Sequence, residues 1–147
     1  MAQGDRLYTQ ALQEAEKQNP NNALVKELLE KSLKKGNSKA AYALGTWYLH
    51  GQFVEEDLVK AIELITQAAE DNLSNANFDL AVCYEQAKGV KKNEELAFIH
   101  YLKAALQGDS QAIYEVGRCY FHGIGIGKSE KIANVWLDQA AEYGIED

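Results

Sequence analysis

The 147-residue sequence contains one proline, two cysteines and no hydrophobic run long enough to span a bilayer. Because proline breaks helices, its near absence favours a helical globular chain. The lack of a long apolar run argues against a membrane protein, and the polar stretch from Met1 to Pro20 does not have the pattern of a signal peptide. We therefore expect a cytoplasmic protein.

Positive charge is also scarce. Fifteen Lys and Arg face twenty-two Asp and Glu, which gives a net charge of −7, and residues 38–73 alone carry two lysines against six carboxylates. Nucleic acid and anionic membranes attract proteins with a basic surface, and no basic stripe occurs in this chain. A protein partner with a basic surface fits the composition better.

The two cysteines, Cys83 and Cys119, are 36 residues apart and would occupy equivalent places in neighbouring repeats. Equivalent points on stacked helices lie roughly 8 to 10 Å apart or more, beyond the roughly 7 Å Cα separation that a disulfide allows. We expect two free thiols. Two isolated cysteines and three scattered histidines do not form a metal ligand set, and the sequence indicates no cofactor.

What the sequence does contain is a 36-residue period. Three sets of residues recur at this step: Ala40, Ala76 and Ala112; Leu44, Leu80 and Val116; and Tyr48, Tyr84 and Tyr120. A fixed period of this length predicts stacked helical units that together bury a continuous core. Within each unit the apolar residues fall at helical spacing in two segments, which predicts two helices.

Residues that start and stop helices recur at the same step. Candidate N-caps are Asn21, Asp57, Asn93 and Ser129, and residues suited to a left-handed helix end are Gly36, Asn72, Gly108 and Gly144. The pattern predicts eight helices and no strand, in a single domain over residues 1–147. Its four repeats would span residues 1–37, 38–73, 74–109 and 110–147, the first being a divergent cap.

The pattern AxxxLGxxYxxG at 40–51 and its counterpart AxxxVGxxYxxGxG at 112–125, each followed by a paired alanine, resemble the Sel-one-like repeat family, a relative of tetratricopeptide repeats. The resemblance implies an all-α, right-handed α-solenoid whose first helices line a concave groove. It also implies a protein that binds other proteins, in signalling, assembly or bacterial host interaction. Because no nucleophile, base and orienting group fall at related spacings, we expect a protein that is not an enzyme.

The residues most suited to binding lie at first-helix positions that the repeat pattern leaves free. Arg118, Phe121 and His122 combine a cation, an aromatic ring and a titratable ring at helical spacing, and arginine and aromatic residues are common binding hot spots. The set on the predicted concave face is Arg118, Phe121, His122, Trp47, His50, Leu49 and Glu85. Two alternatives stay open, namely partial burial of Trp47 and contact of Phe121 with Ile124.

The segment from Gly123 to Ser129 resembles a phosphate-binding loop superficially. The nucleotide-loop pattern requires a glycine where His122 stands and a strand before the loop, whereas a helix is predicted there. We therefore interpret the glycines as an inter-helix turn.

Three functions remain after these exclusions. The first is a monomeric adaptor or scaffold that holds a protein partner in the groove. The second is an immunity or inhibitor protein that masks a toxin or enzyme. The third is a hydrolase, because the resemblance includes cysteine-rich members that bind or hydrolyse β-lactams, although this chain lacks the paired cysteines of that branch.

Overall fold

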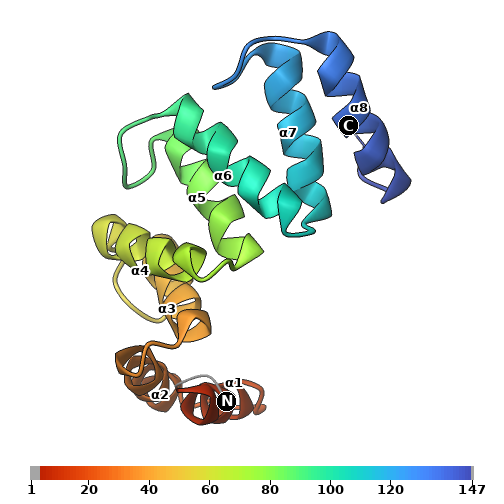
Figure 1. Ribbon diagram of the computed structural model, residues 1–147. Coiled ribbons are helices and arrows are strands. Elements are labelled where there is room, and N and C mark those ends of the chain that lie inside the picture. Colours follow the sequence, from red (N-terminus) through yellow and green to blue (C-terminus); the bar gives the residue numbers. More distant parts are fainter. Residues whose placement is uncertain (1–3, 147) are drawn as a thin grey trace. The chain divides into compact units, whose positions relative to one another are not determined.

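The computed structural model describes residues 4–146, and all regular secondary structure in that range is α-helical (Figure 1). The helices are α1 (Asp5–Ala15), α2 (Asn22–Lys34), α3 (Ser38–His50), α4 (Leu58–Glu70), α5 (Ser74–Gln86), α6 (Glu94–Leu106), α7 (Ser110–His122) and α8 (Glu130–Glu142). The predicted all-α fold of eight paired helices is confirmed.

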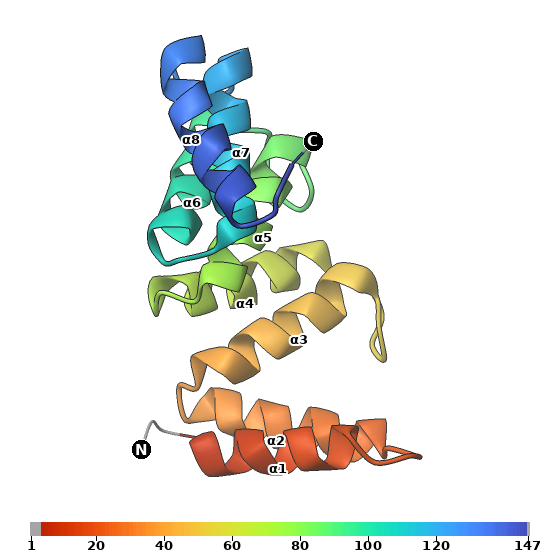
Figure 2. The same ribbon diagram turned by 90° about the vertical axis from the view of Figure 1, so that its right-hand side faces the viewer.

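The chain divides into two compact units, Met1–Asp71 and Asn72–Asp147. In the first unit α1 packs on α2, α2 on α3 and α3 on α4; in the second, α5 packs on α6, α6 on α7 and α7 on α8. Figure 2 shows the same helices from a second direction. Each unit is a stack of two repeats, and the division lies beside the predicted repeat boundary at residue 73.

The predicted starts of the second helices are confirmed in all four repeats. The side chains of Asn21, Asp57 and Asn93 each accept a hydrogen bond from the backbone N–H three residues later at 3.1, 3.1 and 3.0 Å, and Ser129 does so at 3.2 Å. These bonds satisfy amides that a helix start leaves unpaired.

The predicted ends are confirmed as well. Gly36, Asn72, Gly108 and Gly144 all adopt the left-handed conformation, with φ between 64° and 97°. Glycine takes this conformation without steric cost, and asparagine tolerates it better than most residues, so the local sequence stops each second helix where it does.

Small residues in the first helices allow the two helices of a pair to approach closely. A Cβ atom at Gly45 would lie 2.7 Å from Ile65 Cγ1, and one at Gly117 would lie 2.8 Å from the Leu137 side chain. Both positions therefore require glycine with the present packing. The corresponding residue of the third repeat, Ala81, is fully buried.

The third repeat has a polar pair in its interior. Asn77 is 1% exposed and stands where the neighbouring repeats have Ala41 and Ile113. Its Oδ1 accepts a hydrogen bond from Nδ1 of His100 at 2.9 Å. Burial, together with the charge of Lys103, lowers the pKa of His100. Replacing either Asn77 or His100 alone would leave the other buried polar group without this hydrogen bond, which would destabilise the fold.

Cys83 and Cys119 are free and buried, which confirms the prediction of two unbridged thiols. Burial raises the pKa of both, that of Cys119 to about 12. Thiols with raised pKa values are poor nucleophiles, so these residues contribute to packing.

Candidate functional site

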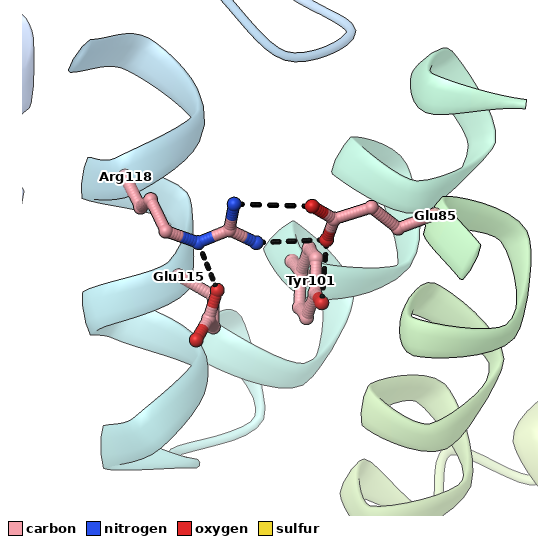
Figure 3. Close-up of polar contacts among 4 residues, drawn as sticks. All are labelled: Glu85, Tyr101, Glu115 and Arg118. Carbon is pink, nitrogen blue, oxygen red and sulfur yellow. Dashed lines mark hydrogen bonds and ion pairs between the residues drawn. The ribbon is translucent and has the colours of Figure 1, made fainter. Parts of the chain in front are cut away.

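Arg118 lies on α7 at the centre of a polar network that joins three helices of the second unit (Figure 3). Its two terminal nitrogens donate to both carboxylate oxygens of Glu85 on α5, at 2.7 and 3.0 Å. Its Nε donates to Glu115, one turn earlier on α7, at 2.6 Å. This two-pronged geometry is the strongest form of arginine–carboxylate pairing.

Tyr101 completes the network from α6, because its hydroxyl donates to Glu85 Oε1 at 3.0 Å. Burial would raise the pKa of Glu85, but the hydrogen bonds from Arg118 and Tyr101 outweigh burial and hold that pKa below its ordinary value. Partial burial would likewise lower the pKa of Arg118, and its bonds to both carboxylates raise it instead. With two carboxylates around one guanidinium, the network carries a net charge of −1.

The structure corrects the prediction that position 118 is a free surface position. The Arg118 side chain is 26% exposed, and those of Glu85 and Glu115 are 22% and 16% exposed. Arg118 and Glu85 are 33 residues apart, which is one repeat less one helical turn. Helical spacing could have indicated only the contact with Glu115, three residues earlier on the same helix, and it gives no signal for the pairing with Glu85 on α5.

Phe121 and His122 occupy the last turn of α7, beyond the network. Phe121 is 38% exposed, and its ring contacts the imidazole of His122 edge to face with centroids 5.0 Å apart. Both side chains are accessible to a partner. The exposed large hydrophobic residues on first helices within 4–146 are Leu12 and Phe121, whereas most of the others lie on second helices.

The remaining predicted residues belong to the first unit, at the end of α3. Trp47 is half-buried and packs against Phe53 with ring centroids 4.9 Å apart. His50 is exposed. Leu49 is only 5% exposed, so the prediction that it faces a partner is wrong. Its side chain is apolar and α3 packs against both α2 and α4, which favours its burial in the helix interface.

Phe53 was missed by the sequence analysis. It is 55% exposed and has a φ of 63°, although bulky residues rarely adopt the left-handed conformation. Aligning the repeats would have marked Phe53 as unusual, because the next two repeats have Gly89 and Gly125 at this position. Both glycines also adopt the left-handed conformation.

Within residues 4–146, no group of three or more His, Cys, Asp and Glu side chains could hold a metal ion. In the same range, the helices are too short or too polar to cross a bilayer.

Comparison with known proteins identifies the family. The Sel1 repeat matches residues 38–73, 74–109 and 110–144. The first two matches have the bounds of the predicted second and third repeats, and the last match ends three residues before the predicted fourth repeat does. The chain therefore belongs to the Sel1 repeat family. No curated protein matches the sequence.

Several solved structures share the fold. A Sel1 repeat protein from Oxalobacter formigenes is 36% identical, with a TM-score of 0.73 over 80% of this chain and 89% of that one. A protective antigen present in uropathogenic Escherichia coli strains is 24% identical, with a TM-score of 0.92 over 98% of this chain. This chain spans only 31% of the length of that antigen.

Two further structures share the fold. Cysteine rich protein B of Helicobacter pylori is 28% identical, with a TM-score of 0.63 over 84% of this chain and 93% of that one. An immunity protein from Pseudomonas aeruginosa is 22% identical, with a TM-score of 0.62 over 98% of this chain and 54% of that one. At 22% identity, the likeness to the immunity protein shows the shared fold alone.

Proposed function

We propose that this chain is a non-catalytic protein-interaction module, an adaptor or scaffold, that binds its partner through exposed side chains at the ends of its first helices. The observation that carries the proposal is the exposure of Phe121 beside His122, next to the ordered Arg118 network. An accessible aromatic ring bordered by a rigid polar group has the composition of a binding hot spot. The Arg118 network positions the end of α7 and presents a polar rim.

The contact surface in the second unit consists of Phe121 and His122, with Arg118 and Glu85 at its edge. In the first unit, Trp47 and His50 are the corresponding candidates. Leu49 is buried and is not part of the proposed contact surface. A basic surface on the partner, a monomeric chain and a cytoplasmic location stay predictions of the sequence.

An immunity or inhibitor role is the second candidate, supported by the fold shared with the immunity protein of Pseudomonas aeruginosa. A hydrolase role is not proposed. The cysteine-rich branch relies on paired cysteines in each repeat, and the two cysteines of this chain are unpaired and buried.

Quantitative affinity capture from the native organism tests the proposal. Three baits are compared at equal loading: the natural chain, Phe121→Ala and the control Ile99→Ala. Ile99 is a matched control because it is 42% exposed on α6, a second helix of the same unit. We expect one stoichiometric protein with the natural chain and the control, and strong depletion with Phe121→Ala.

Equal capture by all three baits would contradict the proposed surface. If the captured partner is an enzyme or toxin that the chain inhibits, the immunity role replaces the adaptor role.

A further inference from the structure

The turn between α3 and α4 differs from its counterparts in the third and fourth repeats at a backbone position that favours glycine. Gly89 and Gly125 occupy this position in the third and fourth repeats with φ of 77° and 69°, whereas the second repeat has Phe53 at φ 63°. The ring is 55% exposed, so burial does not offset the unfavourable backbone conformation. Phenylalanine thus stands here against the backbone preference for glycine.

A second difference lies beside the first. Trp47 stands where the later repeats have Cys83 and Cys119, which are 2% and 0% exposed. Trp47 is half-buried instead, and its ring packs against Phe53 at 4.9 Å with an interplanar angle of 59°. Two changes specific to the second repeat thus build one accessible aromatic platform.

The platform borders a hollow of about 470 Å³. Its lining consists of Tyr48, Phe53, Val54, the carboxylates Glu55, Glu56 and Asp57, and the cations Lys26 and Lys60. Lys60 lies over the Tyr48 ring, 4.5 Å from its centroid, so one aromatic face of this hollow already holds a cation of the chain itself. Glu55 and Glu56 are exposed and form no hydrogen bond or ion pair within residues 4–146.

A second hollow, between the start of α6 and the turn that follows α7, has a different character. It measures about 720 Å³ and is lined by Lys92, Glu94, Glu95 and Gly125 among others, with no aromatic residue. Acidic groups line both hollows, but of these two hollows only the one beside Phe53 has aromatic residues in its lining. Residues 38–73 also carry the most negative charge of any repeat.

We infer that this surface, formed by Trp47, Phe53, Glu55 and Glu56, binds an arginine side chain of the protein partner. A guanidinium stacks on an aromatic face and pairs with carboxylates, so it matches both halves of the surface. The inference rests on the proposed function, to which it adds the chemistry of the partner and a second contact point.

Nuclear magnetic resonance titration with a capped peptide of alternating glycine and arginine tests the inference. The indole N–H signals of Trp47 and Trp136 report where the peptide binds, and a glycine–glutamate peptide is the charge control. Phe53→Gly is the decisive variant because it removes the ring, keeps the net charge and copies the residue of the third and fourth repeats. We expect a shift of the Trp47 signal alone, and an affinity about fivefold weaker in Phe53→Gly.

Charge is tested separately by comparing Glu55→Gln/Glu56→Gln with the matched pair Glu94→Gln/Glu95→Gln. The first pair should weaken binding about fivefold and the second less than twofold. Absence of binding, unchanged affinity in Phe53→Gly, or equal losses for the two pairs would overturn the inference. If the peptide test fails but Phe121→Ala still lowers capture of the partner, the proposed function stands and only the arginine site is lost. If Phe121→Ala leaves capture unchanged but Phe53→Gly weakens peptide binding, the Phe121 surface is excluded and the arginine site stands.

Discussion

Arg118→Ala tests the role of the polar network of the second unit. The substitution removes all three hydrogen bonds to Glu85 and Glu115 and leaves two carboxylates facing each other without a cation. Removing one partner of a fully buried ion pair costs about 3 to 5 kcal/mol, and an exposed pair contributes about 1 kcal/mol or less. With side chains 16% to 26% exposed, we expect a loss of about 2 kcal/mol in the free energy of unfolding.

At about 3 °C per kcal/mol for a chain of this size, the melting temperature should fall by about 6 °C. Thermal and urea unfolding, followed by circular dichroism, measure both quantities. Lys39→Ala is the control, because Lys39 is exposed on α3 and should change stability by about 0.5 kcal/mol or less.

A double-mutant cycle isolates the ion pair. In the Glu85→Gln/Arg118→Ala variant the buried charge and its partner are both gone, so the combined loss should be smaller than the sum of the single losses by about 1 kcal/mol. Additive losses, or an Arg118→Ala melting temperature within 1 °C of the natural chain, would refute the network as a stabilising element.

The pH dependence gives an independent check. Because the pKa of folded Glu85 is held below its ordinary value, the stabilisation is fully present above the unfolded pKa of about 4.3 and is lost as the pH falls through the lower folded value. Arg118→Ala should lose less stability over that acid range than the natural chain does.

Three further outcomes are expected. Phe53→Gly should raise the free energy of unfolding by about 1 kcal/mol, because it relieves a left-handed phenylalanine; a lower melting temperature would contradict this. Stability should fall as the pH drops below about 6.5, since burial lowers the pKa of His100, and the Asn77→Ala/His100→Leu variant should lose part of that dependence; identical profiles would show that His100 does not contribute. Alkylation of the denatured, non-reduced protein should label both Cys83 and Cys119, whereas a mass two units lower without label would reveal a disulfide.

The repeat period and the capping residues were sufficient to predict the helices. Asn93 and Gly108 illustrate why: a cap or a left-handed end depends on one residue and its immediate neighbours, so local sequence determines it. The long-range pairing of Arg118 with Glu85 depends on how α5 and α7 face each other across α6. Periodicity alone does not show that geometry.

The prediction for Leu49 was wrong, and Phe53 was not predicted at all, for different reasons. Leu49 was classed as free because the repeats disagree at that position, yet disagreement between repeats does not measure exposure. Phe53 lies in a turn, where apolar periodicity carries no information, and only its alignment with Gly89 and Gly125 marks it as unusual.

Isothermal titration of the captured partner against the natural chain, Phe121→Ala and Ile99→Ala tests the central claim most directly. Phe121→Ala is preferable to any change at Arg118, because Phe121 is 38% exposed and its removal should shift the melting temperature by only a few degrees. Loss of an aromatic hot spot costs about 2 kcal/mol of binding free energy, or roughly thirtyfold in affinity. We predict that loss for Phe121→Ala and less than a threefold change for Ile99→Ala. Equal affinity of Phe121→Ala and the natural chain would contradict the claim that the end of α7 binds the partner.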